Sequence, residues 1–216
     1  MIYKKKQKSY KDISRSIPRE LNEQNLIFFS KLLEKYEHFV FFGTLLGLTR
    51  DNRLIDGDDD LDFYVNLKDR TKIIDTLVAN NIDVNLDFDV NKDIHFLQVC
   101  RNINGKNLPV DFYFFEDNLE EDYIVEKWNI KGGTHIPSEH LRIPKIFIYP
   151  IKKIIFKGNK INIPSFPKYL CEFIYGRNWK EKLKKDRDYE IKVINGKPYF
   201  FKISKKFFFF KKKEID

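Results

Sequence analysis

The amino-acid sequence predicts an α+β fold built on a mixed β-sheet, and the order of its apolar patterns is the main reason. Residues 16–36 repeat apolar side chains at helical spacing. Residues 38–43 and 61–67 are short apolar runs typical of buried strands, and a short helical segment lies between them. A second helix is predicted over 69–81. Three further strands are predicted, at 82–88, 94–101 and 108–116. Helices interspersed with strands, followed by several strands in succession, favour a mixed sheet flanked by helices.

Composition limits the chain to a small folded unit. The 216 residues suit one domain, perhaps with a small lobe, and 42% hydrophobic with 16% aromatic content is ample for a packed core. The net charge of +8 favours anionic partners. The longest nearly apolar stretch, 39–49, has about half of the roughly 20 residues that a spanning helix needs. We therefore expect a cytoplasmic protein that could contact a membrane surface peripherally.

The N-terminal half divides into an arm and the start of a core. Residues 1–15 are polar and basic and are expected to form a loose arm, and the core is expected to span 16–131. Ser16 can cap the first helix, and Pro18 fits its first turn. The strand at 38–43 is expected to end at Gly43, with Thr44 near the start of the short helix that follows.

The C-terminal half contains two hairpin signals. Asn104-Gly105 predicts a tight turn between the strands at 94–101 and 108–116. From residue 132 the chain is rich in proline, and residues 132–216 are expected to form an extension that packs on the core. Within it we predict a hairpin over 152–163 that turns at Gly158-Asn159, then a helix ended by Gly176.

Acidic residues gather just before and at the start of a predicted strand. Side chains alternate along a strand, so Asp60 and Asp62 point to the same side, and Asp58 can extend that row. Neighbouring carboxylates repel unless a cation neutralises them, and oxygen ligands suit Mg²⁺ or Mn²⁺. The alternative is a solvated acidic loop, which is the interpretation we prefer for Asp56.

A fourth carboxylate stands alone in an apolar strand. Asp111 lies within "LPVDFYFF", where a buried aspartate without a partner would be costly. It is the expected supplier of a further metal ligand from a neighbouring strand. An exposed position on an edge strand is the alternative.

A phosphate-binding segment is predicted upstream of the acidic row. Gly43 and Thr44 stand between a strand and a helix start, where free backbone N–H groups favour phosphate. Arg50 and Arg53 lie between this segment and the acidic row and could contact phosphate oxygens. Ordinary surface arginines are an equally good interpretation of both.

These residues together resemble a known family. The stretch "GTLLGLTRDNRLIDGDDDLDF", residues 43–63, resembles the LicD/fukutin signature, roughly Gly-Ser/Thr-Leu-Leu-Gly-x-x-Arg-x-x-x-Leu-Ile-Pro-Trp-Asp-Asp-Asp-Ile-Asp. "VDFYFF", "YPIKKIIFKGNKINIP" and "YLCEFIYGRNW" are similar to later family segments, so the resemblance covers about residues 20–185. One departure is that Asp56-Gly57 replaces the family's Pro-Trp, which leaves the identity of the donor open.

The resemblance implies a fold, an activity and a set of site residues. It implies the nucleotidyltransferase fold of the DNA polymerase beta superfamily, and metal-dependent transfer of a substituted phosphate from a CDP-activated donor to a glycan hydroxyl, releasing CMP. The acceptor would be a capsule or surface polysaccharide precursor, or a lipid-linked glycan. Carried over by position, Asp60 and Asp62 resemble the metal-binding pair, Asp58 the preceding acid and Asp111 the acid of the second strand. Gly43 and Thr44 resemble the phosphate-binding pair.

Several alternatives stay open from sequence alone. The same fold could instead move a nucleotide from a triphosphate to a small molecule, a protein or RNA. A non-catalytic, basic nucleic-acid-binding module is a third possibility, although the chain lacks a recognised nucleic-acid motif. Arg101 and His95 are further candidates near the site, and structural roles are the alternative for each. The basic, phenylalanine-rich tail could contact a membrane or pack its rings inward.

Overall fold

The computed structural model describes residues 17–86, 96–127, 140–183 and 188–203. The predicted basic arm, His95, Ser16 and the phenylalanine-rich tail lie outside the described residues. Among the described residues, no helix combines the length and the apolar character that crossing a bilayer requires.

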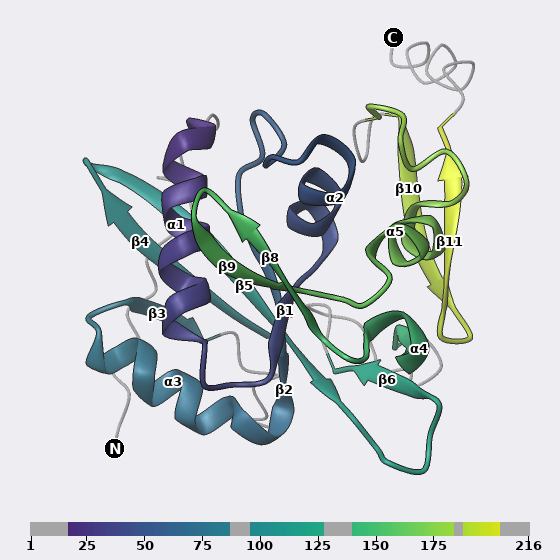
Figure 1. The fold of residues 1–216 in the computed structure, drawn as a ribbon, viewed down its shortest axis with the longest axis horizontal. Helices are drawn as coiled ribbons and strands as arrows, with labels where there is room; N and C mark the ends of the chain where they lie inside the picture. The colour runs from purple at the N-terminus through teal and green to yellow at the C-terminus, as the bar shows by residue number, and fades with distance from the viewer. Residues whose placement is uncertain (1–16, 87–95, 128–139, 184–187, 204–216) are drawn as a thin grey trace, which may run out of the picture.

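A mixed β-sheet forms the centre of the molecule (Figure 1), as the sequence predicts. Its main path runs β1-β2-β5-β4-β3, with β6 paired to β5 and β7 paired to β6. The strands are β1 His38–Val40, β2 Asp62–Asn66, β3 Asp83–Leu86, β4 Phe96–Ile103, β5 Lys106–Glu116, β6 Tyr123–Glu126 and β7 Arg142–Pro144. The β2 and β5 strands are parallel, whereas the other pairs in the sheet are antiparallel.

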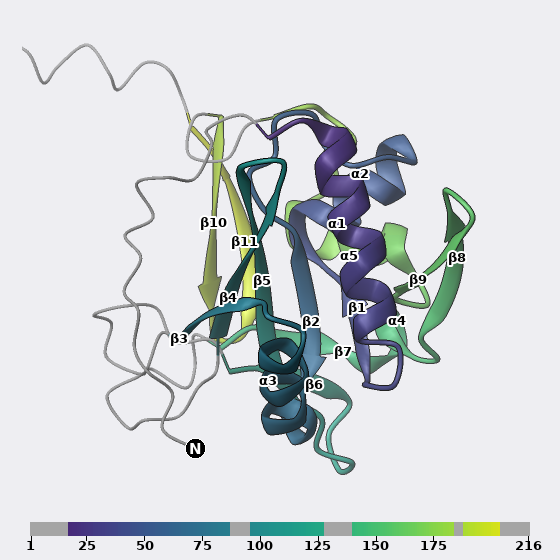
Figure 2. The ribbon, with the colours of Figure 1, turned by 90° about the vertical axis from the view of Figure 1, so that its left-hand side faces the viewer.

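Helices flank this sheet, and α1 covers one of its faces (Figure 2). The Phe29 ring of α1 packs edge-on against the Phe112 ring of β5, with 5.8 Å between the ring centroids. The α-helices are α1 Arg19–Leu32, α2 Phe42–Asp51, α3 Arg70–Ala79, α4 Lys145–Ile148 and α5 Pro167–Tyr175. A short 3₁₀ turn, η2 Leu67–Asp69, joins β2 to α3.

Stacked aromatic side chains define the two faces of the sheet at β2 and β5. Phe63 stacks on Phe112 on the α1 face, and Tyr64 stacks on Tyr113 on the other face. Because side chains alternate along strands, Asp62 and Asp111 share the face of Tyr64 and Tyr113. All five residues of β2 are buried, so packing on both faces fixes the register of this strand.

Two predicted boundaries near the N-terminus are wrong. Helix α1 begins at Arg19, with Pro18 rather than Ser16 at the N-cap. The strand β1 ends at Val40, and α2 begins at Phe42, so Gly43 lies in the first turn of the helix and not at the end of the strand. The reason is a helical hydrogen bond from the Leu45 N–H to the Phe41 carbonyl, with an N···O distance of 2.9 Å.

Three tight turns connect antiparallel pairs. Asn104-Gly105 joins β4 to β5 as predicted, and both residues have positive φ. The hairpin of β8 Lys152–Phe156 and β9 Asn159–Ile163 is also confirmed, but it turns at Lys157-Gly158, one residue earlier than expected. A third turn, Asn195-Gly196, joins β10 Tyr189–Ile194 to β11 Lys197–Lys202. That hairpin, together with β6, β7 and α4, is absent from the sequence-based prediction.

The C-terminal elements make specific contacts with the rest of the chain. The Asn162 side chain donates to the His38 carbonyl of β1 at 3.1 Å, and the Lys157 ammonium pairs with Glu23 of α1. The Arg142 N–H of β7 donates to the Gly196 carbonyl at 2.9 Å. Helix α5 ends as predicted at Gly176, whose φ is +76°.

Burial of His38 generates a testable pH dependence of stability. One ring nitrogen, Nδ1, lies 2.9 Å from the Tyr36 carbonyl, whereas the buried Nε2 has no hydrogen-bond partner. Burial lowers the pKa of His38 from 6.5 to about 4. As the pH falls, His38 therefore binds a proton in the unfolded chain before it does in the folded protein. The stability present above pH 6.5 is lost as the pH falls towards 4. We expect His38 to account for a loss of roughly 3 kcal/mol across this interval.

The measurement is urea-induced unfolding between pH 4 and pH 7, with the wild-type protein and His38→Asn. Asparagine keeps a donor for the Tyr36 carbonyl but does not titrate, so the difference between the two stability curves isolates the histidine. Parallel curves would contradict this assignment.

Candidate metal centre

Parallel pairing of β2 and β5 places two aspartates side by side. Asp62 is the first residue of β2, and its register partner on β5 is Asp111. Backbone hydrogen bonds hold this end of the sheet, because the Asp111 N–H donates to the Leu61 carbonyl at 2.7 Å and the Phe41 N–H donates to the Asp62 carbonyl at 3.0 Å. Both aspartates are buried, with exposed fractions of 5% and 6%.

Asp60 completes a group of three carboxylates. One oxygen each from Asp60, Asp62 and Asp111 lies within 4.8 Å of the other two. A second group, formed by Asp58, Asp59 and Asp60, meets the same criterion and shares Asp60 with the first. The loop before β2 therefore continues the acidic surface from the buried pair towards solvent.

The electrostatic environment opposes full ionisation of this group. Burial and then the neighbouring carboxylate of Asp60 raise the pKa of Asp111 to about 7, although hydrogen bonds from Gln98 and Tyr113 act in the opposite direction. Burial and the charges of Asp60 and Asp59 raise the pKa of Asp58 to about 7. The pKa of Asp62 is raised well above its usual value, first by burial and then by the other three carboxylates.

Gly43 allows α2 to start directly against the carboxylates. A Cβ atom at this position would lie 2.9 Å from Asp58 Oδ2 and 3.5 Å from Asp62 Oδ2. Real Cβ atoms are almost never found closer than 3.0 Å to such a group. The missing side chain therefore leaves room between the first turn of α2 and two of the acidic residues.

Thr44 ties the start of α2 to the start of β2 through two hydrogen bonds. Its hydroxyl oxygen accepts from the Asp62 N–H at 2.8 Å, and its backbone N–H donates to Asp62 Oδ2 at 3.4 Å. Neither bond uses the Thr44 hydroxyl proton, so the hydroxyl can still donate a hydrogen bond. This reciprocal contact fixes the direction of the Asp62 carboxylate.

Gln98 orients Asp111, and the sequence analysis did not identify it. Gln98 lies on β4 directly opposite Asp111, and its Nε2 donates to Asp111 Oδ1 at 2.6 Å. A polar residue in the apolar stretch "FLQVC" was the available signal. The pairing of β4 with β5 had to be known before this signal could be assigned to Asp111.

Tyr175 is a second residue that the site analysis from sequence missed. It is buried near the end of α5, and its pKa is raised first by burial and then by the charge of Asp62, with a smaller contribution from Asp58. Tyr175 opens the Tyr-Gly-x-x-Trp segment that carries part of the family resemblance, and that was the signal available for it.

The three carboxylates fit a hard divalent cation. Their donor set consists of oxygen atoms, which Mg²⁺ and Mn²⁺ prefer. Buried, mutually repelling carboxylates are costly without a neutralising partner, and the raised pKa values of Asp58, Asp62 and Asp111 are consistent with that cost. Asp60, Asp62 and Asp111 would hold the ion, with Asp58 beside them.

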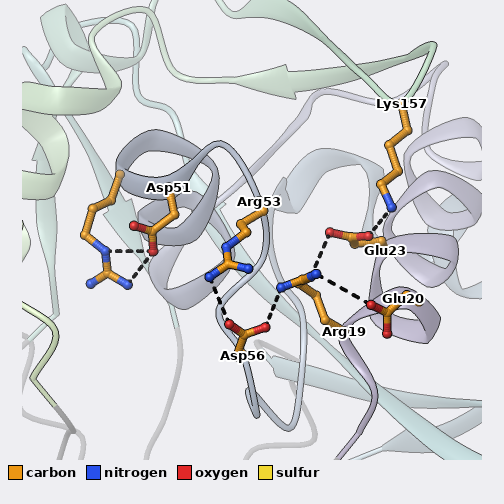
Figure 3. A network of polar contacts seen from close by, with 8 residues as sticks. Arg19, Glu20, Glu23, Asp51, Arg53, Asp56 and Lys157 are labelled. Atoms are coloured by element: carbon orange, nitrogen blue, oxygen red, sulfur yellow. Dashed lines mark hydrogen bonds and ion pairs between the residues drawn. The ribbon is translucent and has the colours of Figure 1, made fainter.

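The two arginines predicted to contact phosphate bind other residues in the structure. Arg50 donates from Nε and Nη2 to Asp51 Oδ2 at 3.0 and 2.9 Å, and from Nη1 to the Glu181 carbonyl. Arg53 forms an ion pair with Asp56 at 3.0 Å, and the same Asp56 also binds Arg19 (Figure 3). The Asp56 side chain is mostly exposed, as expected. It is nevertheless paired with two guanidinium groups.

Arg101 lies on the other face of the sheet. Its guanidinium stacks on the Phe28 ring of α1, with 3.8 Å between the guanidinium carbon and the ring centroid. Gln98 lies three residues earlier on the same strand, and because side chains alternate along a strand it points to the carboxylate face instead. The structure gives Arg101 a packing role with α1 and does not bring it to the acidic group.

Comparisons with known proteins agree with the sequence pattern. Residues 35–165 match the family model described as LicD/FKTN/FKRP, nucleotidyltransferase domain. No curated protein matches the chain. One solved structure that matches is the lincosamide antibiotic adenylyltransferase LnuA with lincomycin bound, which is 15% identical and has a TM-score of 0.44. The alignment covers 66% of this chain and 80% of that one, and a likeness this distant carries no argument about function.

We expect Asp62→Asn to stabilise the metal-free protein. An amide removes one buried charge from the acidic group, and its oxygen can still accept from the Thr44 N–H. The free energy of unfolding at pH 7.5 without metal should rise by about 1–2 kcal/mol. Wild-type protein should melt at a higher temperature when Mn²⁺ is added, and the variant should lose most of that increase. Asp122→Asn, exposed just before β6, is the matched control and should change neither quantity.

Gly43→Ala tests the close approach of α2 to the acidic residues. The added methyl group would push against Asp58 and Asp62, so we expect at least a tenfold weaker affinity for Mn²⁺, measured by calorimetry. Alanine favours a helix over glycine by about 1 kcal/mol, so the variant should fold. Unchanged affinity for Mn²⁺ would show that the space beside Gly43 is not part of the site.

Proposed function

The chain belongs to the LicD/FKTN/FKRP family, and from this premise we propose that it is a metal-dependent transferase of substituted phosphate groups. The donor is a CDP-activated small molecule carrying a phosphocholine-like or polyol-phosphate-like group. The acceptor is a glycan hydroxyl, and CMP is the leaving product. The observation that carries this proposal is the pairing of Asp62 with Asp111 across β2 and β5, with Asp60 within 4.8 Å.

The acidic group supplies the binding part of the mechanism. Asp60, Asp62 and Asp111 would hold Mg²⁺ or Mn²⁺, which when bound neutralises charge on the donor diphosphate. The Thr44 hydroxyl proton and the space left by Gly43 lie at the start of α2, beside Asp62 and Asp58. Both features suit a phosphate oxygen that approaches the beginning of a helix.

Asp111 is the residue that we assign to proton transfer. Its Oδ1 accepts from Gln98, and Tyr113 also donates to this carboxylate, so two hydrogen bonds fix its position. In the metal-free protein, burial and the charge of Asp60 raise the pKa of Asp111 to about 7, so this carboxylate accepts a proton more readily than an ordinary aspartate does. The acceptor oxygen forms a bond to phosphorus, its proton passes to Asp111, and the bond from phosphorus to the CMP oxygen breaks.

Burial supports this chemistry by excluding water. Asp62 and Asp111 are almost inaccessible, and aromatic side chains pack beneath them on the same face of the sheet. Charges interact more strongly in such an environment than in water, so fixed carboxylates and hydrogen-bond donors exert a larger effect on a phosphoryl group.

The decisive measurement is CMP release from CDP-choline, CDP-glycerol and CDP-ribitol in the presence of Mg²⁺, with a glycan acceptor. We expect release that requires both the metal and the acceptor, and a decrease of at least a thousandfold for the double variant Asp60→Ala, Asp62→Ala. A Gln98→Leu variant should keep metal binding but shift the pH dependence of the rate to higher pH, because it removes a hydrogen bond that lowers the pKa of Asp111.

The same assay separates this reaction from nucleotide transfer. Nucleoside triphosphates replace the CDP-linked donors in a parallel reaction, and pyrophosphate is measured in place of CMP. Pyrophosphate release that depends on Asp60 and Asp62, without CMP release from any CDP-linked donor, would favour a nucleotidyltransferase and contradict the proposal.

A further inference from the structure

A basic pocket lies beside the acidic loop but outside the acidic group. Its volume is about 280 Å³, and it is formed by the first turns of α1, the residues that follow α2 and the end of the β8–β9 hairpin. Arg19, Arg53 and Lys157 supply three positive charges to its lining, and Glu23 and Asn52 complete the polar part. These residues come from three separate regions of the chain, so the pocket exists only in the folded protein.

Two guanidinium groups at this pocket converge on one carboxylate. Arg19 Nη1 lies 2.6 Å from Asp56 Oδ1, and Arg53 Nη2 lies 3.0 Å from Asp56 Oδ2 (Figure 3). Two arginines that share a pair of oxygen atoms form the arrangement that recognises phosphate well. Here Asp56 supplies those oxygen atoms from the protein itself.

The other acid of the pocket is already neutralised. Glu23 is buried on α1, contacts the Lys157 ammonium directly and lies 3.5 Å from Arg19 Nε (Figure 3). It therefore holds Arg19 and Lys157 in place. Glu20 also lies 3.5 Å from Arg19, but its side chain is 64% exposed and contributes little. Arg19 and Arg53 thus carry two positive charges against the single charge of Asp56.

Asp56 is well suited to be displaced by a ligand. Its side chain is 61% exposed, and ion pairs at such positions contribute little to stability. It is followed by Gly57, whose φ is +77° and which has open space around the position of a side chain. A phosphate group carries more charge and more acceptor oxygens than a carboxylate, so it can replace Asp56 between the two arginines.

We propose that the two guanidinium groups beside this pocket form a second anion site, which binds a phosphate group of the acceptor substrate, and that Asp56 lies between them when the substrate is absent. The assignment to the acceptor rests on the proposed function, because the donor diphosphate is expected at the acidic group. The two sites are adjacent. Asp58 follows Asp56 by two residues, and its carbonyl accepts from Asn22, the neighbour of Glu23 on α1, at 3.0 Å.

The experiment measures phosphate binding in the absence of metal and of any CDP-linked donor. Purified protein in EDTA, at constant ionic strength, is titrated by calorimetry with inorganic phosphate, glucose 1-phosphate and CMP. We expect glucose 1-phosphate to bind more tightly than CMP, and inorganic phosphate to bind measurably. Arg53→Gln should weaken binding of glucose 1-phosphate about tenfold, because it removes one of the two guanidinium groups.

Asp56→Asn distinguishes a binding site from an anchoring network. If Asp56 competes with the ligand, the variant should bind glucose 1-phosphate about three- to tenfold more tightly, as expected when an exposed ion pair is removed. Lys160→Gln is the matched control, because Lys160 is exposed on β9 and does not line the pocket. It should bind like the wild-type protein.

Three outcomes would overturn the proposal. Unchanged or weaker binding by Asp56→Asn would show that Asp56 only anchors the loop. Unchanged binding by Arg53→Gln would place the ligand elsewhere, and a preference for CMP that Arg53→Gln abolishes would assign the pocket to the donor. The Asp60→Ala, Asp62→Ala variant should still bind glucose 1-phosphate, so a failure here is distinguishable from a failure of the proposed transfer reaction.

Discussion

Repulsion among buried carboxylates is the constraint on which the rest of this structure depends. Asp62 and Asp111 stand side by side because β2 and β5 are parallel and in register, and Asp60 adds a third charge at the same end of the sheet. Burial and mutual repulsion raise the pKa values of the members, so the arrangement is costly in the protein alone. The stacked rings of Phe63 on Phe112 and Tyr64 on Tyr113 hold the two strands together immediately below it.

Each residue that surrounds the carboxylates has a distinct mechanical role. Thr44 couples the start of α2 to the start of β2, and Gly43 lets that helix approach without a clash. Gln98 fixes Asp111 from the neighbouring strand. These contacts come from α2 and β4, so the site depends on the relative positions of two elements around the central pair of strands.

The ionic network at the edge of the site gives the acidic loop a second attachment. Asp56-Gly57 departs from the family signature that the sequence resembles, and the structure shows Asp56 between Arg19 and Arg53. The loop that carries Asp58 and Asp60 is therefore connected through Asp56 to α1 and, through Glu23, to the β8–β9 hairpin. An anion that replaced Asp56 would alter a loop only two residues from the acidic group, which physically relates the basic pocket to the proposed reaction.

The sequence by itself determined the class of fold, the hairpin at Asn104-Gly105 and the clustering of acids before β2, because these follow from side-chain periodicity, turn preferences and local charge. It also singled out Asp111, since an isolated acid in an apolar strand needs a partner. Only the tertiary structure decided that Asp111 lies opposite Asp62, that Gln98 holds it and that Arg101 points away, because strand pairing and the choice of face are not local properties. Arg50 and Arg53 have acidic partners close in sequence, Asp51 and Asp56. Only the structure shows that Arg19 shares Asp56 and that Arg50 also donates to the Glu181 carbonyl, because these partners are distant in sequence.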